Sequence, residues 1–175
     1  MRVALFADMH ANREAFEACL LRRPDWPEAH LNAGIAYARS GNAEAARASF
    51  HDALMLRPDS SDAVRGLAAL ALDLGDFDDA YQQHRRLIEL GEHGPELFYN
   101  AGLICQKRGQ TQDAVTFYQQ ALNEDPQFAE ALLNLGHALM SLGQEDDARS
   151  FWRRAIREKP ELAQTYFDPP SEPVA

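Results

Sequence analysis

Apolar residues recur along much of this chain at intervals of three and four positions. Phe50, Ala53 and Leu54 show this spacing in one segment, and Tyr118 and Leu122 show it in another. Residues spaced in this way share one face of an α-helix, which can then pack against a neighbouring helix. Proline and glycine interrupt the pattern, so the predicted helices have about 13 residues and a length of about 20 Å. The pattern indicates an all-α protein.

The helical pattern repeats every 34 residues along the sequence. Three residue types mark this period: Gly41, Gly75, Gly109 and Gly143; Ala46, Ala80, Ala114 and Ala148; and Pro24, Pro58, Pro126 and Pro160. Glu92 occupies the one place in the proline series that lacks a proline. A chain with such a period forms a stack of similar units, none of which can bury its apolar face alone.

Each part of the period has a physical role. The glycine permits a tight turn before the second helix of each pair, and a polar residue follows it at the N-cap position. Those polar residues are Asn42, Asp76, Gln110 and Gln144. Small residues such as Gly34, Gly102 and Gly136 let the two helices of a pair approach closely. Proline then ends the second helix.

The segment "ALLNLGHALMSLGQEDDARSFWRRAIREKP" resembles the tetratricopeptide repeat, a helix-turn-helix unit. The residues in family positions are Leu135, Gly136, Gly143, Ala148, Trp152, Ala155 and Pro160. The resemblance covers four full repeats, at residues 27–60, 61–94, 95–128 and 129–162. It implies a right-handed α-solenoid built from such repeats. Repeat 61–94 departs most from the family pattern, at Ala68, His84, Leu87 and Glu92.

Both ends of the chain differ from a full repeat. Residues 1–26 predict a partial repeat in which residues 11–23 correspond to the second helix, and residues 163–168 predict a short stub. We therefore expect one solenoid domain over residues 1–168, followed by a disordered tail at residues 169–175. Solenoids need polar caps on their terminal repeats, and both ends here are poorly supplied with them. We expect homo-oligomers that form through one or both ends.

The first 20 residues, "MRVALFADMHANREAFEACL", are also similar to the start of calcineurin-like metallophosphoesterases. That resemblance implies metal ligands at Asp8 and His10. The repeat pattern gives a competing interpretation, in which Asp8 is a helix N-cap and His10 lies in the exposed first turn. The sequence lacks the later Gly-Asn-His motif of that enzyme family, and two protein ligands cannot hold a catalytic divalent ion. We therefore predict no catalytic residue, no metal site and no cofactor.

The charge balance narrows the classes of partner. The sequence has 27 acidic and 17 basic residues and a formal net charge of −10, which disfavours nucleic acid and anionic lipid. No stretch approaches the ~20 consecutive apolar residues of a membrane-spanning helix. The two cysteines, Cys19 and Cys105, show neither metal-binding nor disulfide-framework spacing. These features predict a cytoplasmic protein with protein or peptide partners.

By the resemblance, the first helix of each repeat lines a concave groove, where peptide-binding residues are expected. The predicted set is Leu31, Asn32, Ile35, Arg39, Arg65, Leu72, Tyr99, Asn100, Leu103, Lys107, Leu133, Asn134, His137 and Met140. Asn32, Asn100 and Asn134 share one repeat position, which holds Gly66 in the second repeat. A carboxamide offers a donor and an acceptor to an extended peptide backbone, although it can also satisfy groups of its own helix.

The sequence thus predicts an interaction scaffold with no chemistry of its own. One alternative is a regulatory or targeting module of a larger enzyme or assembly. The other is a protein derived from metallophosphoesterases that uses Asp8 and His10.

Overall fold

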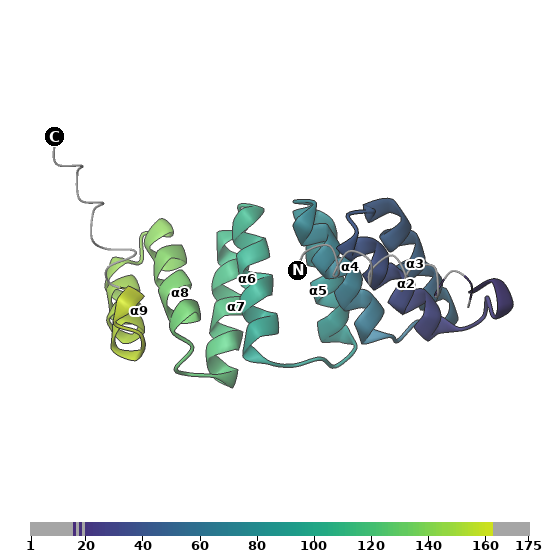
Figure 1. The fold of residues 1–175 in the computed structure, drawn as a ribbon. Helices are drawn as coiled ribbons and strands as arrows, with labels where there is room; N and C mark the ends of the chain where they lie inside the picture. Colours follow the sequence, from purple (N-terminus) through teal and green to yellow (C-terminus); the bar gives the residue numbers. More distant parts are fainter. Residues whose placement is uncertain (1–15, 17, 19, 163–175) are drawn as a thin grey trace. The chain divides into compact units, whose positions relative to one another are not determined.

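The computed structural model describes residues 16, 18 and 20–162. Every regular element in this part is an α-helix, which confirms the predicted all-α fold (Figure 1). The helices are α2 (Pro27–Arg39), α3 (Ala43–Leu56), α4 (Ser61–Asp73), α5 (Phe77–Glu89), α6 (Pro95–Lys107), α7 (Thr111–Glu124), α8 (Ala129–Ser141) and α9 (Glu145–Glu158). Within the described ranges, no helix is both long enough and apolar enough to span a bilayer.

Each predicted full repeat contains one pair of helices. We call the first of each pair the A helix (α2, α4, α6 and α8) and the second the B helix (α3, α5, α7 and α9). The glycines between them, Gly41, Gly75, Gly109 and Gly143, have φ values between 71° and 77°. Glycine adopts this left-handed conformation without steric cost, so the predicted role of these residues in the turns is confirmed.

The predicted N-caps of the B helices differ in how they bond. Asn42 accepts a hydrogen bond from the backbone N–H of Ala45 at 3.2 Å, and Asp76 accepts one from Asp79 at 3.1 Å. Gln110 and Gln144 occupy the same position without a capping bond from their side chains. Glutamine has one more methylene group, which moves its oxygen away from the amides that a short N-cap side chain reaches.

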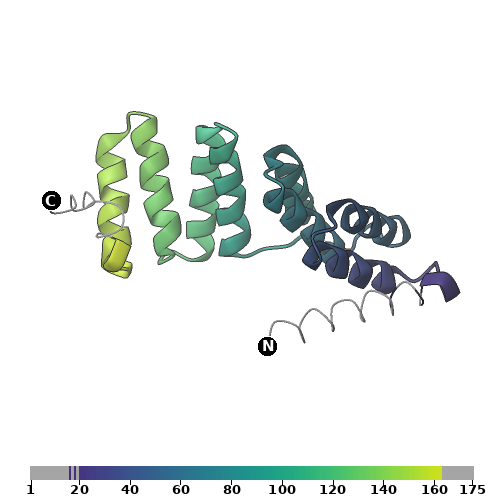
Figure 2. The same ribbon diagram turned by 45° about the horizontal axis from the view of Figure 1, so that its top comes forward.

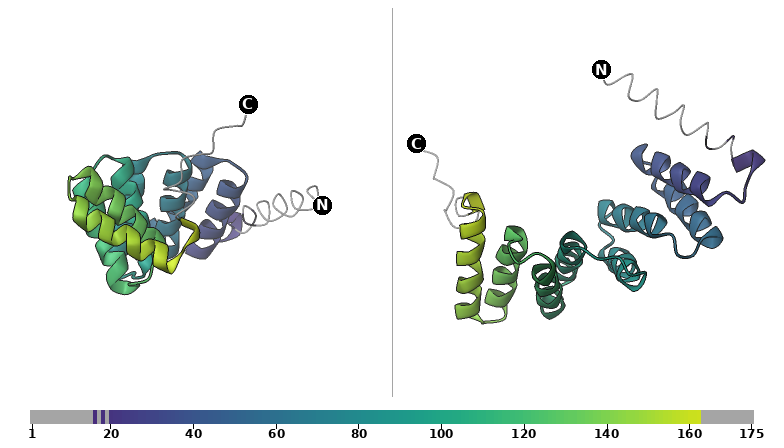
Figure 3. Two further views of the ribbon diagram at one scale, coloured as in Figure 1. Left: turned by 90° about the vertical axis from the view of Figure 1, so that its left-hand side faces the viewer. Right: turned by 90° about the horizontal axis from the view of Figure 1, so that it is seen from below.

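The chain forms two compact units, Met1–Glu92 and His93–Ala175, which we call unit 1 and unit 2. In unit 1, α2 packs against α3 and α4, and α4 also packs against α3 and α5. In unit 2, α7 packs against α6 and α8, and α8 packs against α9 (Figures 2 and 3). The expectation of one continuous solenoid over residues 1–168 stays a prediction.

An aromatic ring of the B helix lies on a glycine of the A helix in three of the four repeats. A methyl group on Gly34 would lie 2.7 Å from the ring of Phe50, and one on Gly102 would lie 2.5 Å from the ring of Tyr118. Trp152 covers Gly136 in the same way. These contacts confirm that the small residues allow the two helices of a pair to approach closely.

Repeat 61–94 has a different pair at these two positions, Ala68 and His84, and both side chains are buried. The imidazole Nδ1 of His84 lies 2.9 Å from the carbonyl oxygen of Ala80. A carbonyl only accepts, so the ring carries a proton on Nδ1 and donates it. Burial lowers the pKa of His84, because it disfavours the charged form of the ring.

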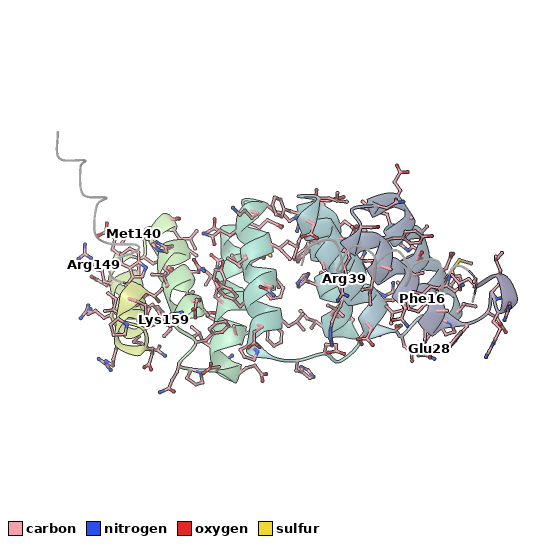
Figure 4. All side chains as sticks on the ribbon, in the orientation of Figure 1. Phe16, Glu28, Arg39, Met140, Arg149 and Lys159 are labelled. Carbon is pink, nitrogen blue, oxygen red and sulfur yellow. The ribbon has the colours of Figure 1, made fainter. Side chains whose placement is uncertain are left out.

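An ion pair joins the start of the A helix to the residue after the B helix in the first and last full repeats. Glu28 pairs with Arg57 at 2.6 Å, and Glu130 pairs with Lys159 at 2.7 Å; Figure 4 labels Glu28 and Lys159. The hydrogen bond from Lys159 lowers the pKa of Glu130. The pairs tie the two helices of a repeat together at the ends that lie away from the turn.

Candidate functional site

The predicted binding residues all lie on the A helices, which makes two candidate surfaces. The A face of unit 1 consists of Leu31, Asn32, Ile35 and Arg39 on α2 and Arg65 and Leu72 on α4. The A face of unit 2 consists of Tyr99, Asn100, Leu103 and Lys107 on α6 and Leu133, Asn134, His137 and Met140 on α8. Figure 4 labels Arg39 and Met140, one on each face.

The A face of unit 1 combines apolar and polar surface. Ile35 and Leu72 are each 37% exposed, and they lie on two helices that pack together. Asn32 and Arg39 are also exposed, and Leu31 is half-buried. Arg65 forms an ion pair with Glu92, so part of its charge is neutralised within the unit. This surface can bury apolar side chains of a partner next to hydrogen-bonding groups.

The A face of unit 2 contains a hydrogen bond between two predicted residues. Asn134 Nδ2 donates to the hydroxyl oxygen of Tyr99 at 3.0 Å, which links α8 to α6. The ring of Tyr99 lies near that of Phe128, with 5.0 Å between the ring centres. Asn134 is therefore held in place by its own unit, and one of its amide hydrogens is used there.

The two other asparagines are more accessible. Asn32 and Asn100 are exposed, and in the described part of the chain neither side chain has a hydrogen-bond partner. Lys107 is exposed near Asn100 in the sequence, and Leu103 and Met140 are half-buried. These two carboxamides therefore retain unused donor and acceptor groups at the surface.

The prediction that Leu133 belongs to the binding surface is wrong, because its side chain lies on the buried side of α8. It is 1% exposed and belongs to a buried cluster with Leu132, Ala155 and Leu162. Leu162 follows α9 and contributes to the core at this end of unit 2, so Leu133 has no surface to offer a partner. His137 is half-buried, with 5.2 Å between its ring centre and that of Trp152. Burial lowers its pKa, so its ring is neutral at pH 7.

Two observations concern candidate metal-binding and nucleophilic groups among the described residues. No three His, Cys, Asp or Glu side chains there gather as metal ligands would. Burial raises the pKa of the Cys105 thiol to about 11, so this side chain is protonated at pH 7 and is a poor nucleophile. Asp8 and His10 lie outside the described residues.

A pocket in unit 2 was not predicted. It has a volume of about 380 Å³ and lies on the B-helix side, between α7, α8 and α9. Its lining residues are Gln119, Leu122, Asn123, Leu135, Phe151 and Arg154. The sequence holds one signal for it, because Phe151 adds a second aromatic residue beside Trp152, at a position that is serine or glutamine in unit 1.

Several solved structures are similar to this one. A crystal structure of MamA has 21% sequence identity and a TM-score of 0.80, and the match covers 93% of this chain and 95% of that chain. MamA 41-end from Desulfovibrio magneticus RS-1 has 18% identity and a TM-score of 0.75, covering 95% and 92%. YrrB, described as a TPR protein with an unusual peptide-binding site, has 21% identity and a TM-score of 0.76, covering 89% and 80%.

No curated protein sequence matches this chain. A family profile described as tetratricopeptide repeat matches residues 38–91 and 106–165. The matched residues do not include Asp8 and His10, so the resemblance of residues 1–20 to metallophosphoesterases gains no support from it. The profile covers more than half of the 175 residues, and the helices agree with its repeats. The chain therefore belongs to the tetratricopeptide repeat family.

Proposed function

We propose that this protein is an interaction scaffold that binds an extended peptide segment of a partner protein on its A faces. One observation carries the proposal. Asn32 and Asn100 occupy the same repeat position on α2 and α6, and both carboxamides are exposed and without a hydrogen-bond partner among the described residues. The peptide-binding site named for YrrB, a protein of similar fold, adds support.

The chemistry of these faces suits a peptide backbone. A peptide in extended conformation presents one N–H and one C=O for each residue, and a carboxamide can pair with both. Ile35 and Leu72 in unit 1 supply apolar area at the same face, which favours burial of peptide side chains. The faces thus combine backbone hydrogen bonding, which does not depend on side-chain identity, with apolar contacts that do.

The test is the substitution Asn100→Ala, measured by isothermal titration calorimetry with peptides selected from a random library on the full chain. Loss of the carboxamide is expected to weaken binding by about 1–2 kcal/mol, because peptide groups lose a partner. Gln82→Ala is the matched control, since Gln82 is an exposed carboxamide on the B helix α5. Equal affinities of Asn100→Ala and the unaltered protein would contradict the proposal.

We also propose that the protein forms homo-oligomers and that it is located in the cytoplasm. Leu21, which precedes α2, is 87% exposed, and such apolar surface at the end of a repeat array favours contact with a second copy. Light scattering is expected to show a mass that rises with concentration, and a monomeric mass throughout would contradict this. The free thiol of Cys105 is consistent with the reducing cytoplasm.

A further inference from the structure

The pocket on the B-helix side of unit 2 has an apolar floor and a polar rim. Leu135 is fully buried, and Leu122 and Phe151 are half-buried around it. Gln119 and Asn123 are exposed at the rim. A volume of about 380 Å³ is sufficient for one large apolar side chain.

The corresponding place in unit 1 is filled differently. Gln83, two repeats before Phe151, donates to Asp79 at 2.8 Å, and Asp79 also pairs with Arg47 at 3.1 Å. Thus polar side chains bond to one another between α3 and α5, whereas unit 2 has Phe151 at the position of Gln83 and Val115 at that of Arg47. Leu54 and Leu67 hold the positions of Leu122 and Leu135, and Arg86 at the position of Arg154 donates to the carbonyl of Pro58 at 2.7 Å. The feature that distinguishes the pocket in unit 2 is therefore the aromatic ring of Phe151, in place of a glutamine that is engaged in a polar contact.

Positive charge borders the pocket on one side. Arg154 lines it, with its guanidinium 5.4 Å from the centre of the Phe151 ring and one N–H donated to the carbonyl of Pro126 at 3.2 Å. Arg153 and Arg157 are exposed on the same helix. No carboxylate in the described ranges pairs with any of these three arginines.

Arg149, labelled in Figure 4, differs from them, because it already pairs with Glu145 at 2.9 Å. A guanidinium that lies over an aromatic ring and retains unused N–H groups is well placed to bind a carboxylate. In a chain with a net charge of −10, Arg154 at the pocket and the exposed Arg157 one turn further along α9 carry positive charge that no carboxylate of the described residues neutralises.

We propose that this pocket is a second binding site, separate from the A faces, and that its ligand is an acidic peptide segment with one apolar anchor residue. The anchor side chain enters the pocket between Leu122 and Phe151. Carboxylates on either side of the anchor pair with Arg154 and Arg157. The complementarity of charge selects the acidic segment, and the apolar side chains of Leu122 and Phe151 select the apolar anchor.

The test uses fluorescence anisotropy of the full chain with short synthetic acidic peptides that carry a central Leu, Phe, Met or Trp. Two matched sets replace the acidic residues by lysine or the central residue by alanine. We expect binding of the acidic set with an apolar centre and at least about tenfold weaker binding of both matched sets.

Variants separate the two parts of the site. Arg154→Gln is expected to weaken binding about tenfold, and Arg154→Lys is expected to recover part of the loss. Asn123→Trp narrows the mouth of the pocket from an exposed position and is expected to weaken binding of every peptide with a large anchor. Arg149→Gln is the control, and it should leave affinity unchanged because Arg149 is paired within α9.

Three results would overturn the proposal. The first is equal affinity for acidic and lysine-containing peptides. The second is unchanged affinity in both Arg154→Gln and Asn123→Trp. The third is a concentration-dependent mass of the protein alone that Arg154→Gln abolishes, because the occupant would then be a second copy of the chain.

Discussion

Repeat 61–94 in unit 1 and repeat 95–128 in unit 2 each consist of an A helix and a B helix. The two repeats differ in the side chains at the contact between these helices. Unit 2 places Tyr118 against Gly102, whereas unit 1 has His84 and Ala68 at the same two repeat positions. Histidine has a smaller ring than tyrosine, and alanine is larger than glycine by one methyl group. In these two repeats the combined volume of the pair is therefore constrained more tightly than the identity of either residue.

The difference also changes the chemistry of the two cores. Tyr118 is fully buried, and its hydroxyl donates to Gln106 at 2.7 Å; burial raises its pKa, so it stays protonated at every physiological pH. His84 is buried in the neutral form, and its ordinary pKa lies close to physiological pH. Unit 1 therefore contains a group that links its stability to pH, and unit 2 has none at the equivalent position.

The largest effect is expected from Tyr118→Ala. This change leaves a cavity against Gly102 and should lower the free energy of unfolding by about 3–5 kcal/mol, measured by urea denaturation. His84→Ala removes fewer buried atoms and should cost less. Tyr118→Phe serves as the control, because it removes only the hydroxyl and should cost about 1 kcal/mol. Equal losses for Tyr118→Ala and His84→Ala would refute the volume argument.

The second prediction concerns Gly102→Ala. The added methyl group would lie 2.5 Å from the ring of Tyr118, so the helices must separate or the ring must move, at a cost of about 1–3 kcal/mol. The double variant Gly102→Ala with Tyr118→His copies the pair of repeat 61–94. It should recover much of the loss relative to Tyr118→His alone, and strictly additive effects in this double-mutant cycle would contradict the comparison.

The third prediction concerns pH. The pKa of His84 is lowered in the fold, so below about pH 6.5 the unfolded chain binds a proton that the folded chain does not. Stability should therefore be complete above this pH and fall as the pH is lowered below it, until the lowered pKa of the folded state is reached, with a slope of up to about 1.4 kcal/mol per pH unit. The non-titrating variant His84→Asn, compared at each pH by urea denaturation, should show a shallower slope. Identical slopes would exclude His84 as the source.

The smallest effect is expected at the contact between the B helices of unit 1. Arg47→Gln removes the partly exposed ion pair with Asp79 and should lower the free energy of unfolding by about 0.2–1 kcal/mol, less at high salt. A cycle with Asp79→Asn isolates the pairwise energy. A loss of unfolding free energy several times larger would show that this polar contact stabilises the interface between α3 and α5 as strongly as apolar packing does.

Much of the fold was predictable because its signals are local. The A helices α2, α4, α6 and α8 begin at residues 27, 61, 95 and 129, where the repeat period placed them. The glycine turns and two of the four N-cap bonds also agree with the prediction. Each of these features depends on residues within a few positions of one another, so the periodicity carried the information.

The candidate site was less predictable. Asn100 is exposed, as expected. Leu133, one position before the equivalent asparagine on α8, lies in the core, because Leu162 from beyond α9 joins the buried cluster that contains it. The hydrogen bond between Asn134 and Tyr99 also joins residues from different repeats. Repeat position alone cannot distinguish these residues, since their exposure depends on what the adjacent repeat supplies.

The period, the starts of the A helices and the close approach of the two helices in a pair could all be inferred from the amino-acid sequence. These follow from steric rules that act within one repeat. The burial of Leu133, the hydrogen bond between Asn134 and Tyr99, and the pocket among α7, α8 and α9 became apparent from the packed structure alone. Such features depend on how completely the side chains of two neighbouring repeats fill the space between them. The 34-residue period of the sequence does not indicate how well that space is filled.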